Sequence, residues 1–227
     1  MDASVDVKNY SISRDEKTAA FASRDEKGVS HVWIAPTDHR SSPRMFASTE
    51  NEDSPWLLPD GRVLYRVTRQ GKNYLYERKV EGGEAKPAIE QPILQFFSAS
   101  PDGKWVVVAV SEARDPEHPY RISAYPLAGG KEVALCRMIC TADWNTSGSG
   151  MHFGFFEAKS ADYFLPIEKG VGLPQVGPDG MAGSEDAKKL AKAERAAENT
   201  VDSAVSVDLY SFSRKTVRRN LYRVPLE

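Results

Sequence analysis

The stretch that decides the fold is Ser98-Ala99-Ser100-Pro101-Asp102-Gly103-Lys104, which runs directly into the apolar sequence WVVVAV at residues 105–110. Proline fixes φ at the first central position of a turn, aspartate accepts local hydrogen bonds, and glycine tolerates a positive φ. A tight hairpin needs those three properties in that order. The stretch therefore predicts a turn at 100–104 that leads into a strand.

The same turn recurs along the chain, and its spacing indicates the architecture. The aligned positions, separated by 45, 42 and 45 residues, are Asp15, Asp60, Asp102 and Ser147. A period in that range is typical of the four-stranded blades of a β-propeller. Turn chemistry accounts for the Asp-Gly pairs at Asp60 and Gly61 and at Asp102 and Gly103. We therefore interpret these four as structural turn residues rather than catalytic groups.

Each unit also carries a six-residue strand sequence. These hexads lie at 32–37, 75–80, 122–127, 162–167 and 221–226, and four of the five have proline at the fifth position. Proline is expected where a strand ends at the rim of a blade, because it cannot donate a ladder hydrogen bond. We therefore predict an all-β propeller of four-stranded antiparallel blades, with four to five blades present and the ring partial or open.

The repeat makes residues 1–227 a single, partial propeller domain. The predicted blades cover approximately 7–47, 50–90, 92–137 and 140–170, with a final half-blade at 204–227. Residues 170–203 interrupt the pattern as a loop and helix insertion. Within it, an alanine-rich, charged segment at 184–198 predicts a surface helix capped by Ser184.

Composition restricts the function classes. The 227 residues carry a net charge of −2, which gives no electrostatic reason to expect binding to nucleic acid or to an anionic membrane. No apolar run approaches the roughly 20 residues of a membrane span, and residues 1–6 lack the apolar core of a signal peptide. We expect no membrane insertion by this chain. Its location would be extracytoplasmic if a membrane-tethered parent carries it and cytoplasmic otherwise.

Cys136 and Cys140 are the only cysteines. Zinc usually takes four ligands, and no second pair of cysteine or histidine residues stands at zinc-like spacing, so no metal or cofactor is expected. Two readings of the pair stay open. We favour structural thiols, and the alternative is a local disulfide.

The candidate binding residues lie in loops, which are the exposed parts of a propeller. Arg69 and Lys72 flank one hairpin turn, and Arg114 and His118 lie in a second loop. The alternative for all four is a solvated polar loop without a ligand. Aromatic residues inside the strands are expected to fill the core between blades rather than to stack on a ligand.

The Ser-Pro-Asp-Gly-Lys turn at 100–104 and the apolar strand after it resemble the TolB-type, WD-repeat-like propellers of bacteria. The tail at 210–226 (YSFSRKTVRRNLYRVPL) and the segment 135–144 are similar to the C-terminal propeller portion of bacterial eukaryotic-like serine/threonine kinases. This resemblance implies a non-catalytic module that binds or senses a protein or a small-molecule ligand, within a larger signalling protein. The sequence itself has no Gly-rich phosphate loop, His-Arg-Asp or Asp-Phe-Gly motif, so kinase chemistry is carried over to none of its residues.

Two further functions stay open. Propellers also accompany prolyl-oligopeptidase-type hydrolases, whose chemistry needs a Gly-x-Ser-x-Gly elbow with Asp and His later in the chain. The nearest string, at 146–150, has misplaced glycines, and only His152 follows it. The other function is a TolB-like envelope scaffold, which would need export. We also expect the chain to be the C-terminal piece of a longer protein, and an incomplete ring predicts self-association through open blade edges.

Overall fold

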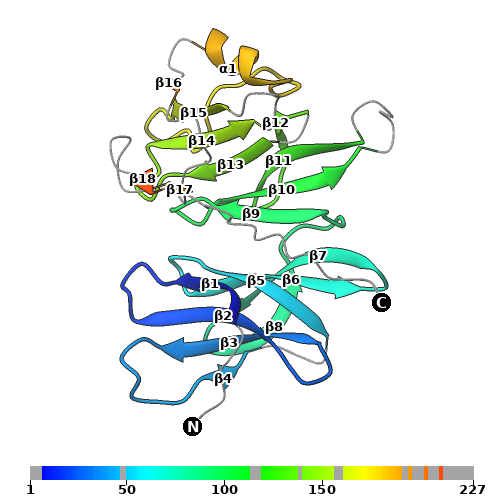
Figure 1. Cartoon of the computed structure of the whole chain (residues 1–227), viewed down its shortest axis with the longest axis vertical. Helices are drawn as coiled ribbons and strands as arrows, with labels where there is room; N and C mark the ends of the chain where they lie inside the picture. Colours follow the sequence, from blue (N-terminus) through cyan, green and yellow to red (C-terminus); the bar gives the residue numbers. More distant parts are fainter. Residues whose placement is uncertain are drawn as a thin grey trace, which may run out of the picture.

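The computed structural model describes residues 7–46, 50–112, 119–137, 140–155, 161–190, 194–195, 202–203 and 210–211. It confirms an all-β fold of four antiparallel, four-stranded blades in a propeller arrangement, with one short helix near the C-terminus (Figure 1). Within each blade the strands pair in chain order, so every blade is a simple meander.

Each of the four blades contains four consecutive strands, apart from the helix that precedes the last strand of blade 4. Blade 1 contains β1 (Val7–Ile12), β2 (Thr18–Arg24), β3 (Ser30–Pro36) and β4 (Arg44–Met45). Blade 2 contains β5 (Asn51–Leu57), β6 (Arg62–Arg69), β7 (Lys72–Lys79) and β8 (Gly82–Pro87). Blade 3 contains β9 (Gln95–Ala99), β10 (Trp105–Ser111), β11 (Tyr120–Pro126) and β12 (Val133–Cys136). Blade 4 contains β13 (Cys140–Trp144), β14 (Gly150–Phe155), β15 (Ala161–Pro166) and β16 (Glu194–Arg195).

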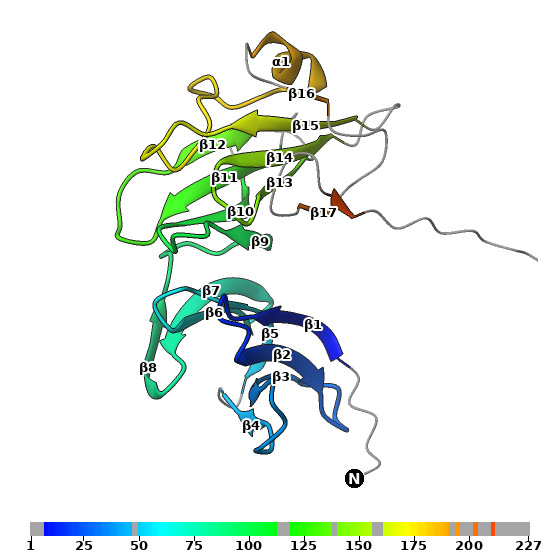
Figure 2. The ribbon, with the colours of Figure 1, turned by 90° about the vertical axis from the view of Figure 1, so that its left-hand side faces the viewer.

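The blades form two halves. Blades 1 and 2 make the lower half of Figure 1 and blades 3 and 4 the upper half. The first strand of blade 3, β9, lies on the side of the upper half nearest to β1 and β5 in both views (Figures 1 and 2). The first strand of a blade therefore lies toward the middle of the molecule, and the fourth strand lies at the rim.

The turns between first and second strands have the geometry that their residues favour. Asp102 Oδ1 accepts hydrogen bonds from Ser100 Oγ (2.6 Å) and from the Lys104 N–H (3.1 Å). Gly103 has a φ of 70°, and a Cβ placed on it would lie 3.1 Å from Cδ of Pro59 in the preceding blade. Glycine is thus needed twice here, for its backbone conformation and for the close approach of two turns.

Blade-to-blade packing follows the alternation of the second strands. The carbonyl that closes each turn belongs to Thr18, Arg62, Trp105 or Gly150. Counted from that carbonyl, the first, third and fifth residues along the second strand are apolar and face the preceding blade. They are Val63, Tyr65 and Val67 in β6, Val106, Val108 and Val110 in β10, and Met151, Phe153 and Phe155 in β14. Two positions after that carbonyl the residue faces the next blade, as in Ala20, Leu64 and Val107. Period-two alternation thus makes both faces of a middle blade apolar.

The strand aromatics divide between core and partial cover. Tyr65 (2% exposed) and Trp144 (6%) lie in the cores between blades. Trp56 and Trp105 are partly buried against those cores. Trp33 is half-buried on the face of blade 1 that points away from blade 2.

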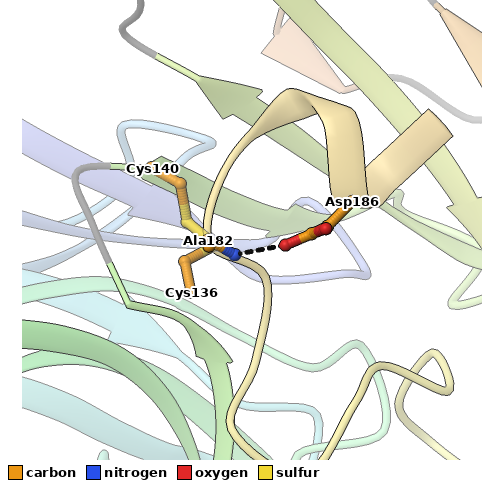
Figure 3. The surroundings of a disulfide bond; sticks show 4 residues. All are labelled: Cys136, Cys140, Ala182 and Asp186. Atoms are coloured by element: carbon orange, nitrogen blue, oxygen red, sulfur yellow. Dashed lines mark hydrogen bonds between the residues drawn. A yellow bond between two sulfur atoms is a disulfide. The ribbon is translucent and has the colours of Figure 1, made fainter. Parts of the chain in front are cut away.

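The helix is shorter than the sequence predicts. It covers α1 (Ser184–Lys189) rather than 184–198, and Gly183 rather than Ser184 holds the N-cap position. The Ala182 N–H instead donates to Asp186 Oδ2 (2.9 Å), in the first turn of the helix (Figure 3). The prediction of a Ser184 cap is therefore wrong, because an acidic residue in the first turn binds the chain entering the helix.

The segment after the helix completes blade 4. Glu194 and Arg195 form β16, which pairs with Phe164 and Tyr163 of β15. A residue range predicted as an insertion outside the blades thus supplies the fourth strand. Helix propensity yields here to strand pairing, which covers the open edge of the blade.

Cys136 and Cys140 form a disulfide bond, which contradicts the favoured interpretation as thiols (Figure 3). The bond joins the end of β12 in blade 3 to the start of β13 in blade 4, and both residues are buried. By closing a small loop it contributes about 2 kcal/mol through restriction of the unfolded chain. Spacing in sequence could not decide the matter, because bonding depends on the Cα separation that the two strands impose, 6.4 Å.

The chain between β15 and α1 lies along the outer edge of blade 3. The Met181 N–H donates to Leu135 O (2.8 Å), and the Arg137 N–H donates to Met181 O (2.9 Å). Arg137 also forms an ion pair with Asp179 (2.8 Å). This short parallel contact covers the edge of β12 beside the disulfide.

Little of the predicted final half-blade is described. Two short strands, β17 (Asp202–Ser203) and β18 (Tyr210–Ser211), pair with each other. The remaining residues of 204–227 lie outside the described part of the chain.

Replacing Gly180 should detach the covering segment from β12. Gly180 has a φ of 76°, and an added Cβ would lie 2.8 Å from the Leu135 carbonyl carbon and 3.0 Å from Cys136 N. We expect Gly180→Ala to lower the free energy of unfolding by about 1–3 kcal/mol in thermal or urea denaturation. Gly177→Ala is the matched control, because nothing lies within 4 Å of its added Cβ. Equal effects of the two variants would contradict this packing.

Acid should weaken the turn of blade 3. Burial alone would raise the pKa of Asp102, but the hydrogen bonds from Ser100 and Lys104 outweigh it and hold the pKa below its ordinary value. Because the pKa of Asp102 is lower in the folded than in the unfolded state, the ionised carboxylate stabilises the fold at pH values above the unfolded-state pKa. That stabilisation is lost as the pH falls through the folded-state pKa. We expect Asp102→Asn to flatten the fall in unfolding free energy between about pH 5 and pH 2. Ser100→Ala should flatten it in the same direction, and an unchanged slope in both variants would refute the assignment.

Candidate ligand-binding face

Antiparallel order brings two kinds of loop to one end of the blades. The connections from second to third strands and the crossovers from one blade to the next lie at the same end, opposite the Asp-Gly turns. We call this end the loop face. It carries the β6–β7 turn and the crossover from β8 to β9.

Arg69 and Lys72 lie at the β6–β7 turn, paired across the two strands. The Arg69 guanidinium lies over the Tyr76 ring (4.8 Å to the centroid), donates to Tyr76 OH (2.6 Å) and forms an ion pair with Glu50. The hydrogen bond to Glu50 raises the pKa of Arg69 above its ordinary value. Arg69 is therefore held in place by the protein and borders an open hollow of about 540 Å³ beside Tyr74.

Lys72 borders a second hollow, of about 500 Å³, between blades 2 and 3. We call it the interblade groove. Its lining is Gly71, Lys72, Asn73, Gln91, Pro92, Ile93, Leu94, Val110, Ser111, Glu112 and Arg121. Leu94 is 48% exposed, so an apolar side chain faces solvent among these polar residues.

The crossover from β8 to β9 supplies the lining residues 91–94 and is tied to both blades. The Ile93 N–H donates to Asn73 O (2.8 Å) in blade 2, and the Leu94 N–H donates to Ala109 O (2.7 Å) in blade 3. Backbone hydrogen bonds on both sides fix the position of Leu94. The groove is therefore a preformed feature of the joint between the blades.

One wall of the groove is an ionic cluster. Arg121 pairs with Glu112 (2.6 Å) and with Glu132, and Glu132 also accepts a hydrogen bond from Tyr125 OH. The Nε atom of Arg121 is buried and makes no hydrogen bond in the part of the chain that the structure describes. Lys72 also lines the groove, which therefore presents both signs of charge beside the apolar side chains of Ile93, Leu94 and Val110.

Arg114 and His118 fall at 113–118, outside the described residues. The stem of their loop is described, since the Glu112 N–H donates to Pro119 O (2.8 Å). Glu112 lines the interblade groove, so the stems of both predicted loops border the same hollow.

Sequence reasoning missed three groove residues: Leu94, Glu112 and Arg121. Leu94 carries a usable signal, because it is an apolar residue in a crossover that follows Pro92. Glu112 and Arg121 carry none, since a charge at the end of a strand is ordinary and only the pairing of β10 with β11 brings them together.

The surroundings of His31 and His152, two histidines of the described ranges, bear on whether either belongs to a hydrolytic site. His152 is 7% exposed, and burial lowers its pKa, which favours the neutral ring. Ser147 and Ser149 hydrogen-bond to each other (2.8 Å) within the turn before β14. His31 contacts Asp25 (3.2 Å), but the neighbouring Ser30 lies on the opposite face of the strand. No group of three metal-ligating side chains occurs among the residues described.

No helix in the described ranges is long and apolar enough to cross a membrane. The sequence matches no protein-family model and no curated protein.

Solved structures do resemble the chain. TolB from Acinetobacter baumannii is 15% identical over 78% of this chain and 45% of that chain, with a TM-score of 0.59. The putative TolB from Agrobacterium tumefaciens is 16% identical over 76% of this chain and 70% of that chain (TM-score 0.57). The β-propeller domain of the Trilobed protease from Pyrococcus furiosus is 19% identical over 72% of this chain and 56% of that chain (TM-score 0.53).

Those likenesses show the fold, a TolB-like β-propeller, and at such identities they show no more. The chain spans less than half the length of the Acinetobacter TolB chain that it matches. Any ligand, partner or activity must be argued from the residues of this chain.

The ionic wall of the groove should matter for stability more than Lys72 does. Arg121→Met removes the cation shared by Glu112 and Glu132, so we expect a loss of about 1–2 kcal/mol in unfolding free energy. Adding Glu132→Gln to that variant should restore part of the loss. Lys72→Met, which removes an exposed charge at the mouth, should stay within about 0.5 kcal/mol of the parent. Urea denaturation measures all three, and a Lys72 effect as large as that of Arg121 would contradict the assignment.

Proposed function

We propose that the chain is a non-catalytic binding module and that its interblade groove receives an exposed segment of a partner protein. The observation that carries the proposal is Leu94, an exposed apolar side chain held by backbone hydrogen bonds between two blades. Loops fixed on a rigid scaffold are the usual place for recognition.

The chemistry of the groove favours a polypeptide as the ligand. The apolar side chains of Ile93 and Leu94 can contact a hydrophobic side chain of the partner, while Lys72 and Glu112 can pair with an acidic or a basic one. A nucleic acid would need a basic surface, and this groove has mixed charge. An open hollow suits a side chain on a protruding segment better than a small molecule, which usually binds in an enclosed pocket.

The larger setting is also a proposal. A serine/threonine kinase parent with a signalling role rests on the resemblance of the tail at 210–226, of which the structure describes only Tyr210–Ser211. A TolB-like envelope scaffold is the alternative that the two TolB structures favour. An accessory propeller of a hydrolase is supported by the likeness to the propeller of the Trilobed protease.

The disulfide supports an extracytoplasmic location for this module. Structural disulfides persist in oxidising compartments and are rare in a reducing cytosol. The Cys136–Cys140 bond is buried at the joint of blades 3 and 4. A cytoplasmic location would leave that joint without its covalent link.

Site-specific photocrosslinking tests the binding proposal. A benzophenone amino acid replaces Leu94 in one sample and Glu84, an exposed residue of β8, in the control. Incubation with extract of the source organism should give a discrete adduct from position 94 and not from position 84. A synthetic peptide covering the crosslinked segment should then bind the unmodified chain in calorimetry.

Charge reversal makes the test specific to the groove. Lys72→Glu or Glu112→Lys should each weaken the binding of that peptide about tenfold, which corresponds to the loss of one charge contact worth about 1.4 kcal/mol. Adducts that are alike at positions 94 and 84, or peptide binding that ignores both reversals, would sink the proposal.

A further inference from the structure

The disulfide between blades 3 and 4 is covered by a segment from farther along the chain. Cys136 and Cys140 are 0% and 1% exposed, so the bond is closed off from solvent. Residues 179–187, which run into α1, pass this bond, and we call them the Met181 segment (Figure 3). Thiol–disulfide exchange needs access to a sulfur atom, so a reductant reaches this bond only when part of its cover opens.

Backbone contacts hold the Met181 segment directly against Cys136. The Met181 N–H donates to Leu135 O (2.8 Å) and the Arg137 N–H donates to Met181 O (2.9 Å), so one hydrogen bond lies on each side of Cys136. An added Cβ on Gly180 would lie 3.0 Å from Cys136 N, so the two backbones are in contact. The Met181 side chain is buried in the same apolar cluster as both cysteines. Whatever fixes the position of Cys136 therefore also fixes the segment.

The other described anchors of the Met181 segment are weak. Asp179 forms an ion pair with Arg137 (2.8 Å), but both side chains are exposed, and exposed ion pairs contribute little. The helix α1 has six residues, too few to be stable without tertiary contacts. The two residues that it buries, Ser184 and Ala187, are small. We therefore expect the segment to open at a lower free-energy cost than the strands of the blades.

We propose that the Met181 segment is a redox-controlled cover of the β12 edge. The intact bond ties Cys136 at the end of β12 to Cys140 at the start of β13 and so holds the edge in place for the segment. A dithiol is the reductant. When the segment opens, one thiolate of the dithiol attacks a cysteine sulfur, the S–S bond breaks, and the other cysteine sulfur leaves as a thiolate.

The second thiol of the reductant completes the exchange. It displaces the bound cysteine from the mixed disulfide, and the reductant departs as a disulfide. Two electrons and two protons thereby pass from the dithiol to Cys136 and Cys140, which become thiols.

Reduction and opening of the segment favour each other. Coupling between two equilibria is reciprocal, so the factor by which a closed segment disfavours reduction is the factor by which reduction favours opening. Once the segment is open, Leu135 O and the Arg137 N–H lose their partner, Met181. The outer edge of β12 then becomes available for strand pairing, which the closed segment prevents.

Thiol trapping on the folded full chain tests whether opening of the segment limits reduction. The oxidised protein is exposed to dithiothreitol, samples are quenched with iodoacetamide, and mass spectrometry counts the alkylated cysteines. Gly180→Ala, whose added Cβ would lie 2.8 Å from the Leu135 carbonyl carbon, should speed reduction roughly tenfold. Gly177→Ala should leave the rate unchanged, because nothing lies within 4 Å of its added Cβ.

A second control separates opening of the segment from unfolding of the whole chain. Gly103 has a φ of 70°, and its added Cβ would lie 3.1 Å from Cδ of Pro59, in a turn at the opposite end of blade 3 from the disulfide. Gly103→Ala should therefore destabilise the fold without speeding reduction. Equal acceleration by Gly103→Ala and Gly180→Ala, or no acceleration by Gly180→Ala, would overturn the proposal.

Hydrogen exchange tests whether reduction opens the segment. In the dithiothreitol-reduced parent chain, the Met181 and Arg137 amides should lose protection roughly tenfold, because they make the two hydrogen bonds beside Cys136. The Val107 amide, in the buried second strand of blade 3, should keep its protection. Unchanged exchange at Met181 and Arg137 would overturn the proposal. An equal loss at Val107 would also overturn it, since the bond would then hold the whole blade rather than a cover.

Discussion

The structure depends on one constraint, which is that each blade must cover the apolar face of its neighbour. A four-stranded sheet cannot bury both of its faces alone, so its stability comes from the sheets on either side. The second strands show how the sequence meets this need. Val106, Val108 and Val110 serve one neighbour of blade 3, and Val107 and Ala109 serve the other. Neighbouring strands of each meander hydrogen-bond to each other through the backbone, which leaves the faces of the sheet free for packing.

The joints between blades follow from that packing and explain where binding features can arise. At the joint of blades 3 and 4 a disulfide and the Met181 segment secure the rim. At the joint of blades 2 and 3, backbone hydrogen bonds hold the crossover and leave Leu94 exposed. Rigid blades thus position a groove that a free loop could not maintain.

Much of the fold could be predicted from sequence, because its turns depend on local chemistry. The Asp-Gly turns and the alternation after them act within a few residues, so blade number and strand order are readable. The disulfide, the strand Glu194–Arg195 and the short helix depend on contacts between distant segments. The groove is a similar case. Arg69 and Lys72 could be singled out from the sequence as charged loop residues. Arg121 became a candidate only through its ion-pair partners, Glu112 directly after β10 and Glu132 directly before β12.

Residue-level hydrogen exchange on the full chain at low concentration tests the central claim, that coverage of both faces sets the stability of a blade. If the claim holds, amides of β6 and β10, whose blades are covered on both sides, exchange slowest and only by global unfolding. Amides of β2, whose blade is covered on one side, should exchange faster through local opening of blade 1. Protection of β2 equal to that of β6 and β10 would contradict the account.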